Sequence, residues 1–529
     1  MVVATVAVPK GKPAVPVGGE RHPVLGFGAQ LNTFVFTKKN TEFTRVNKQS
    51  QDLTDAQHAR LSAAIQEVAP GHCRIFVQRG LNPDSEKGRR APGFQGFLKT
   101  VKLAEDAGAQ TVNLTWWGQG PYALKARLAA LDWPSKTVLT GWPHSNLPKW
   151  PKALTDPDGP GGMPGPREQM RRFARIIHVA RSQSACVTHA TIQNEPNGHA
   201  TDIAMQGVPN FAMRLYEHLY RCFADALTKL DDPQGKFPTL REAITIVAGD
   251  LVQQGKQKNK GDLTDHQDAW VDYLHANMDR EHGGLESVLD AYSIHVYWKP
   301  GPKPHGEYPA KATDRLDNLV KLATKLAIRK PIYITEYGVR FPVRPESERP
   351  GSFEGMPMER SPESVFEHAW FNARAPQLGY VGLVKWVMYR TDMRTGWGKW
   401  GLIDSPGNRF ERTPMFHMTQ LYNRLVGQNW FAAGLHEDDD LLISRFTGPA
   451  GAEESVLVLN SRDKLRDVRL TGLIKGRRYE QAAINANGHA GLTRPNAVTP
   501  DASGRAPIKV PGRGLLALST RAIGLSAVG

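Results

Sequence analysis

The sequence predicts a (β/α)8 TIM barrel of the α/β class, followed by a small antiparallel β-sandwich domain. Apolar strand-like runs alternate with helical segments eight times over residues 20–427, which is the pattern of a parallel barrel. From residue 428 to the end, short strands follow one another without helices, as in a sandwich. Gly26-Phe-Gly28 lacks the third glycine and the helix start of a dinucleotide fingerprint, so no nucleotide-binding half-repeat is indicated.

The first half of the barrel is predicted from strand and helix signals in turn. Strands are expected over residues 25–31, 73–78, 111–117 and 187–193, because these runs are short, apolar and rich in β-branched residues. Helices are expected over residues 54–68, 96–107 and 167–182, the first of them capped by Thr54. A long segment dense in proline and glycine, residues 143–166, reads as a loop.

The second half continues the same alternation. A helix is expected over residues 211–230, and strands over 243–248, 290–297, 331–335 and 382–388. In the sandwich domain, strands are expected over 441–446, 455–460, 467–470, 508–510 and 515–518. The valine-rich residues 1–19 can add a further strand to that domain.

Composition limits the class of protein. The chain has 529 residues, of which 40% are hydrophobic and 22% charged, as in ordinary globular proteins. No apolar run approaches 18 residues, so we expect no membrane span. The first ten residues lack a positive charge before their apolar part and make a poor signal peptide. We therefore expect a cytoplasmic protein, or a secreted one whose leader has been removed.

The three cysteines, Cys73, Cys186 and Cys222, provide neither a disulfide framework nor the spacing of a metal site. They are expected to be small core residues.

The strong positive charge bears on the partner. The formal charge is +15 and the pI about 9.6. Basic residues are spread along the chain without a nucleic-acid-binding motif, so we expect no nucleic-acid partner. An anionic polysaccharide fits the same charge. Arginines after the last two barrel strands can bind a uronate carboxylate, or can simply form a solvated basic loop: Arg340, Arg344, Arg390 and Arg394.

Two glutamates follow strands that belong to opposite parts of the predicted barrel. Glu195 comes after the fourth strand and Glu336 after the seventh. A parallel barrel collects the C-terminal ends of its strands on one face, so the two carboxylates can meet across a pocket. Taken singly, each lies in a motif that also reads as a turn. A facing pair of carboxylates is what a glycosidase requires.

The joint pattern resembles glycoside hydrolase clan A, whose retaining members carry an acid/base after the fourth strand and a nucleophile after the seventh. The resemblance implies that Glu195 is the acid/base and Glu336 the nucleophile. It also implies five supporting residues: Arg74 holding the nucleophile, Asn194 bonding the sugar 2-hydroxyl, the pair His295 and Tyr297 on the sixth strand, and Trp386 on the eighth strand as the floor of the sugar site.

The family within the clan stays open. Family 5 members usually place a histidine at the end of the third strand, where this chain has Trp116-Trp117-Gly118. That segment, residues 145–150 and the trailing β domain are more similar to families 39 and 30. Sugars stack on aromatic rings, so Trp117 and Trp142 are candidate binding residues, as are Trp116, Trp298, Trp397 and Trp400, although tryptophan is more often core.

The resemblance implies a retaining glycoside hydrolase that cleaves β-type bonds of an oligo- or polysaccharide through a glycosyl-enzyme. We expect the two carboxyl groups to lie about 5–5.5 Å apart. The substrate is a carbohydrate, and no metal or other cofactor is implied. Two alternatives are an inactive carbohydrate-binding barrel and a transglycosylase that uses the same glutamates. The sugar, the linkage and the oligomeric state are not indicated.

Overall fold

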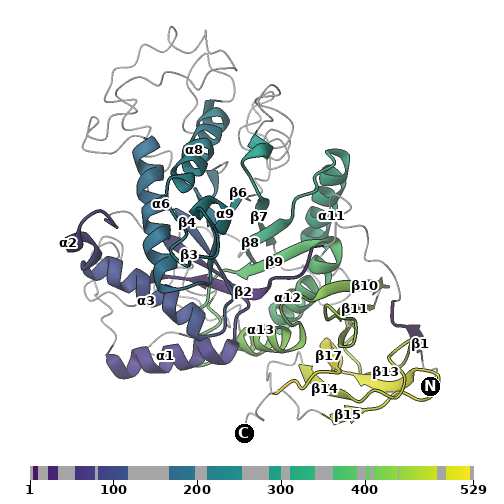
Figure 1. Ribbon diagram of the computed structural model, residues 1–529. Coiled ribbons are helices and arrows are strands. Elements are labelled where there is room, and N and C mark those ends of the chain that lie inside the picture. The colour runs from purple at the N-terminus through teal and green to yellow at the C-terminus, as the bar shows by residue number, and fades with distance from the viewer. Residues whose placement is uncertain are drawn as a thin grey trace, which may run out of the picture.

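The computed structural model describes residues 4–9, 22–33, 54–77, 81–116, 166–196, 211–252, 285–298, 310–339, 362–389, 401–404, 410–438, 440–484 and 496–524. Within these ranges eight parallel strands form a closed barrel, with helices around it and a β domain to one side (Figure 1). The predicted fold class is confirmed.

Each barrel strand pairs in parallel with the next, and the last pairs with the first. The strands are β2 (Gly26–Leu31), β3 (His72–Val77), β4 (Thr111–Trp116), β5 (Val187–Thr191), β6 (Thr245–Val252), β7 (Ala291–Trp298), β8 (Ile332–Val339) and β9 (Tyr380–Lys385). The sequence predicted all eight, and most of their residues are buried because helices cover the outside and side chains fill the interior.

The helices on the outside are amphipathic and bury one face against the strands (Figure 1). The longer ones are α1 (Asp55–Val68), α3 (Pro92–Asp106), α6 (Pro166–Gln183), α8 (Phe211–Thr228), α11 (Ala310–Lys325), α12 (Pro362–Arg374) and α13 (Pro414–Leu425). Thr54 caps α1 as predicted: its hydroxyl accepts from the backbone N–H of Gln57, whose side chain accepts from the Thr54 N–H. Among the described residues, no helix is long and apolar enough to span a membrane.

Three strand ends differ from the prediction by at least three residues, and all three bear on the site. Strand β6 runs to Val252 instead of ending at 248, and β8 runs to Val339 instead of ending at 335. Strand β9 ends at Lys385, so Trp386 follows the strand instead of lying on it. Glycines near the ends of β6 and β8 read as turns in the sequence, but these strands continue through them.

The described residues of the β domain form two sheets. Strand β1 (Ala4–Ala7) pairs in parallel with β13 (Arg466–Thr471), which pairs with β16 (Arg505–Val510). The second sheet has the order β10 (Phe431–Glu437), β11 (Leu441–Thr447), β12 (Glu454–Asn460), β17 (Gly514–Ser519), β14 (Tyr479–Ile484) and β15 (Asn496–Val498). The sequence did not indicate β10, β14 and β15, because the first two contain several alanines or a glycine, which are poor strand signals, and the third is only three residues long.

The larger sheet is buried on both faces. Val456 and Val458 of β12 face the smaller sheet, whereas Leu457 and Leu459 join the core of the barrel. This explains the uninterrupted apolar run of β12, because successive strand residues point to opposite faces. Helix α12 packs against β11, β12 and β17, so the two parts share a continuous core (Figure 1).

A buried histidine pair lies inside the barrel, near the N-terminal ends of the strands. The rings of His72 and His189 are 5.5 Å apart, and His189 lies 5.4 Å from the ring of Tyr333. His189 Nε2 is 3.3 Å from the Tyr333 hydroxyl, and His72 Nδ1 is 2.7 Å from the Thr111 hydroxyl. Burial lowers the pKa of His189 to about 4, and burial together with His189 lowers the pKa of His72 well below its ordinary value.

These histidines predict acid sensitivity of the fold. The pKa of His189 is lower in the folded chain than its ordinary value of 6.5, so the unfolded chain binds more protons as the pH falls below 6.5. The contribution of neutral His189 to the free energy of unfolding is therefore fully present above pH 6.5 and is lost as the pH falls towards 4. We expect His189→Gln to remove about 3 kcal/mol of the difference in unfolding free energy between pH 7 and pH 4.

The measurement is urea unfolding at several pH values. The partly exposed His436→Gln variant serves as the control and should follow the unaltered protein. An identical loss of stability on acidification in all three proteins would contradict the assignment.

Candidate active site

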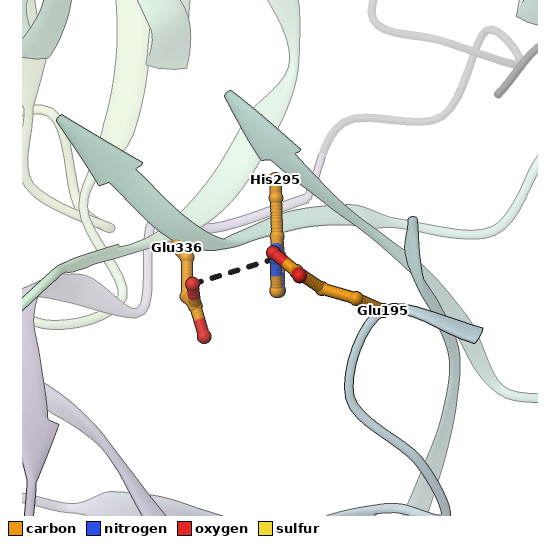
Figure 2. Close-up of side chains that lie close together, drawn as sticks. All are labelled: Glu195, His295 and Glu336. Carbon is orange, nitrogen blue, oxygen red and sulfur yellow. Dashed lines mark hydrogen bonds and ion pairs between the residues drawn. The ribbon is translucent and has the colours of Figure 1, made fainter. Parts of the chain in front are cut away.

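Three acid and base side chains point into one space at the C-terminal end of the barrel (Figure 2). They are Glu195 just after β5, His295 on β7 and Glu336 on β8. His295 Nδ1 lies 2.9 Å from Glu195 Oε1 and 3.5 Å from Glu336 Oε2. One oxygen from each carboxylate and one nitrogen from the imidazole all lie within 4.8 Å of one another. The two glutamates that the sequence singled out therefore do converge.

Local backbone structure places each glutamate. Glu195 has a φ of +48°, which is uncommon for a residue with a side chain, and it turns the chain at the end of β5. Glu336 lies within β8 and is directly opposite His295 of β7 in the strand register. A register shift between Ile294 and His295 accompanies this pairing.

The two carboxylates differ in environment. The Glu336 side chain is 5% exposed, and it accepts hydrogen bonds from Arg74 Nη1 at 2.5 Å and from the Tyr297 hydroxyl at 2.7 Å. The Glu195 side chain is 23% exposed and bonds to His295. Arg74 and Tyr297 therefore fix the position of the Glu336 carboxyl group, whereas Glu195 is the more accessible of the two.

Arg74 lies at the centre of the site and contacts several of its residues, and its side chain is fully buried. It donates to Thr115 Oγ1 at 2.9 Å, to Asn194 Oδ1 at 2.6 Å and to Asp250 Oδ2, besides Glu336. Burial lowers the pKa of Arg74, but the charges of Asp250 and Glu336 outweigh burial and raise that pKa above its ordinary value. The guanidinium is therefore a permanent cation between two carboxylates.

Arg74 also orients Asn194. The amide oxygen of Asn194 accepts from Arg74 Nη2, so the NH2 group is the end that can donate to a ligand. This arrangement suits recognition of a hydroxyl group, which is the role that the clan resemblance implies for Asn194.

Two further groups of the site have shifted proton affinity. Burial lowers the pKa of His295, but Glu336, Glu195 and Asp250 outweigh burial and raise it above 6.5. Burial, followed by the negative charges of Glu336 and Glu195, raises the pKa of Tyr297 well above its ordinary value. The neighbouring carboxylates therefore favour the protonated form of His295, and Tyr297 is a neutral hydrogen-bond donor.

The tryptophans of the sequence analysis fall into three groups. Trp386 follows β9 and lies next to Phe76, with ring centroids 5.8 Å apart, while Phe76 packs beneath Arg74. Trp116 and Trp298 are core residues instead of binding platforms, because they are 3% and 2% exposed and pack on Phe173 and Phe371. The others lie outside the described residues: Trp117, Trp142, Trp397 and Trp400. The arginines Arg340, Arg344, Arg390 and Arg394 lie outside them too.

Sequence reasoning missed Asp250 and the two hydroxyls that contact it, Ser293 and Thr335. All three are buried in strands of the barrel. A signal was present, because a carboxylate and hydroxyls inside otherwise apolar strands require buried partners. It went unused for Asp250, since the strand was expected to end at residue 248.

The close approach of Glu195, His295 and Glu336 is also compatible with a small metal ion. The same atoms already bond to one another, to Arg74 and to Tyr297, in a pattern that suits proton transfer. We assign no metal to these residues.

Comparison with known proteins identifies the fold. No protein-family model matches the chain, and no similar sequence was found among curated proteins. The chain is similar to the solved structure of a family 30 glycoside hydrolase endoxylanase from Clostridium papyrosolvens, with a TM-score of 0.56 and 11% identity over 96% of this chain and 99% of the other.

Two other similar structures cover nearly the whole chain. A conserved exported protein from Bacteroides fragilis has a TM-score of 0.59 and 13% identity over 94% of this chain and 98% of the other. An α-L-arabinofuranosidase from Thermotoga maritima has a TM-score of 0.53 and 12% identity over 98% and 99%. The high coverage shows that the chain shares the barrel and the accompanying β domain with these structures. Because the identities are so low, the similarity shows the fold alone.

Proposed function

We propose that the protein is a retaining glycoside hydrolase that cleaves β-type glycosidic bonds of an oligo- or polysaccharide. The observation that carries the proposal is the Glu195–Glu336 pair, whose nearest oxygens lie within 4.8 Å at the C-terminal end of the barrel. Retaining enzymes hold their carboxyl groups about 5–5.5 Å apart, whereas inverting enzymes need about 6.5–9.5 Å to admit a water molecule. The close pair supports retention.

The environments of the two glutamates support a different role for each. Glu336 is the nucleophile, because Arg74 and Tyr297 both bind its carboxyl group and fix its position. Glu195 is the acid/base, because it is the more exposed of the two glutamates and lacks the contact with Arg74 that holds Glu336 in place. In the first step Glu336 attacks the anomeric carbon while Glu195 protonates the leaving oxygen. In the second step Glu195 takes a proton from water, which displaces Glu336 from the sugar.

The similar structures agree with a carbohydrate substrate. Two of them are named as an endoxylanase and an α-L-arabinofuranosidase. The positive formal charge of +15 favours anionic polysaccharides among the substrates to be tested.

The proposal is tested by a screen of aryl β-glycosides and of neutral and acidic polysaccharides, followed by proton NMR of the first product. We expect hydrolysis of at least one β-glycoside with the β configuration retained. An initial α product would contradict the retaining assignment. Binding of oligosaccharides without any hydrolysis would favour the binding-protein alternative, and transfer to added sugars in preference to water would favour a transglycosylase.

Tyr297→Phe is expected to lower kcat by about 10–100-fold with a smaller change in KM. The variant removes the hydrogen bond to Glu336 at 2.7 Å but keeps the ring. A hydrogen bond to a charged group contributes about 1.5–3 kcal/mol, which corresponds to that range of rates. Steady-state kinetics on an aryl glycoside measure the effect. The buried Tyr389→Phe variant also loses a hydroxyl hydrogen bond, to Asn32, and serves as the control for nonspecific damage.

A further inference from the structure

Asp250 is a buried carboxylate beside the catalytic pair that the proposed reaction does not itself use. It lies on β6, where the pairing with β7 shifts between Ala248 and Leu251. Gly249 and Asp250 have φ angles of +126° and +48° at this bulge. A Cβ at Gly249 would lie 2.2 Å from the backbone oxygen of Ser293, so only glycine fits there. The bulge turns the Asp250 side chain towards the barrel interior.

Every contact of Asp250 shown by the structure is with a barrel strand near the site. Its Oδ2 accepts from Arg74 Nη2. Its Oδ1 accepts from Ser293 Oγ at 2.8 Å and from Thr335 Oγ1 at 2.5 Å, and its backbone N–H donates to Ser293 Oγ at 2.7 Å. His295 Nε2 lies 3.9 Å from Oδ1. A residue with a positive φ and a side chain persists only where such contacts determine it.

The charges of the cluster explain what this carboxylate contributes. Arg74 is a cation that lies between the carboxyl groups of Asp250 and Glu336, and His295 also faces both of these groups. Glu195, which follows β5, is the third carboxyl group of the cluster and contacts His295. Buried charge is costly unless it is balanced, so the cluster is most stable when Glu195 carries a proton. Without the charge of Asp250, the balance would instead favour an ionised Glu195 or a neutral His295.

We propose that Asp250 is a positioning residue that fixes Arg74 between Glu336 and Asn194 and supplies the negative charge that keeps Glu195 protonated. The assignment rests on the proposed function for its effect on catalysis. Asp250 touches neither the sugar nor the reacting atoms in this role, because it acts through Arg74 and His295.

The test compares Asp250→Asn with Asp232→Asn. Asp232 is the matched control, since it is buried and accepts from Arg181 Nε at 2.7 Å on the outside of the barrel. We expect Asp250→Asn to lower kcat/KM about 100-fold and to move the alkaline limb of its pH profile about one unit to lower pH. Asp232→Asn should lower stability and leave that limb in place. An unmoved limb in Asp250→Asn, or equal movement in both, would overturn the proposal.

A second readout does not depend on activity. The pKa of His295, followed by NMR of histidine-labelled protein with His295→Gln to assign the signal, should lie above 6.5 in the unaltered chain and fall in Asp250→Asn. If the unaltered protein hydrolyses no glycoside while this pKa behaves as stated, the proposed function fails and the charge-balancing role stands. If hydrolysis is found and the pKa is unmoved by the substitution, the role of Asp250 fails alone.

A third variant keeps the test informative if Asp250→Asn does not fold. Asp250→Ser also removes the charge and leaves room for water, and it should reproduce the shifts of Asp250→Asn. If neither variant folds, the titration of the unaltered protein decides: a His295 pKa at or below 6.5 would overturn the proposal, because the cluster would then lack the negative charge that it requires.

Discussion

Glu336→Gln is expected to lower kcat/KM by at least about 10⁴-fold and to leave the protein folded. The amide has nearly the same shape as the carboxylate, but it is a poor nucleophile and cannot form the glycosyl-enzyme. Glu336 lies opposite His295 and accepts from Arg74 and Tyr297, so no other carboxylate of the cluster can take its place without rearrangement. Steady-state kinetics on the best aryl glycoside of the screen measure the loss.

The control for this prediction is Glu367→Gln. Glu367 is a buried glutamate that accepts from Trp298 Nε1 at 2.8 Å on the outer side of the barrel, so its substitution also removes a buried charge. Thermal unfolding checks that both variants are folded. Activity of folded Glu336→Gln within tenfold of the unaltered protein would show that Glu336 is not the nucleophile.

Glu195→Ala should lose about 10²–10⁴-fold in kcat/KM on substrates with poor leaving groups and much less on a dinitrophenyl glycoside. A good leaving group departs without a proton, so the first step then needs no acid. The glycosyl-enzyme accumulates, because no base activates water. Sodium azide, an anion that needs no base, should fit the space left by Glu195, restore turnover and yield a β-glycosyl azide.

The azide product distinguishes the two glutamates. In Glu336→Ala, azide would attack the substrate directly from the vacated side and give the inverted α-glycosyl azide. Chromatography and NMR identify the two products. An α product from Glu195→Ala, or equal losses on good and poor leaving groups, would show that Glu195 does not serve as the acid/base.

The sequence alone could predict which residues of the site lie close together, because the order of the strands determines this. Arg74, Glu195, His295 and Glu336 were assigned to different barrel strands, and in a parallel barrel the ends of those strands lie on one face. The two-residue spacing of His295 and Tyr297 likewise places both side chains on the same side of β7.

Asp250 could not be found in the same way, because its position depends on a bulge. Gly249-Asp250 is typical of a turn in sequence, and only the pairing with β7 shows that the strand continues through it. For a related reason, the sequence alone could not separate core tryptophans from tryptophans that bind a sugar. Trp116 and Trp298 lie at strand ends, where sugar platforms occur, but their burial is decided by Phe173 and Phe371 on helices distant in sequence.

The most direct test of the account is mass spectrometry of a trapped glycosyl-enzyme. A 2-deoxy-2-fluoro glycoside of the sugar found in the screen, carrying a good leaving group, forms the intermediate faster than water can remove it. We expect one added glycosyl group per chain, located after peptic digestion on the peptide that contains Glu336. A label on any other residue, or hydrolysis of the parent substrate with inversion and no label at all, would contradict it.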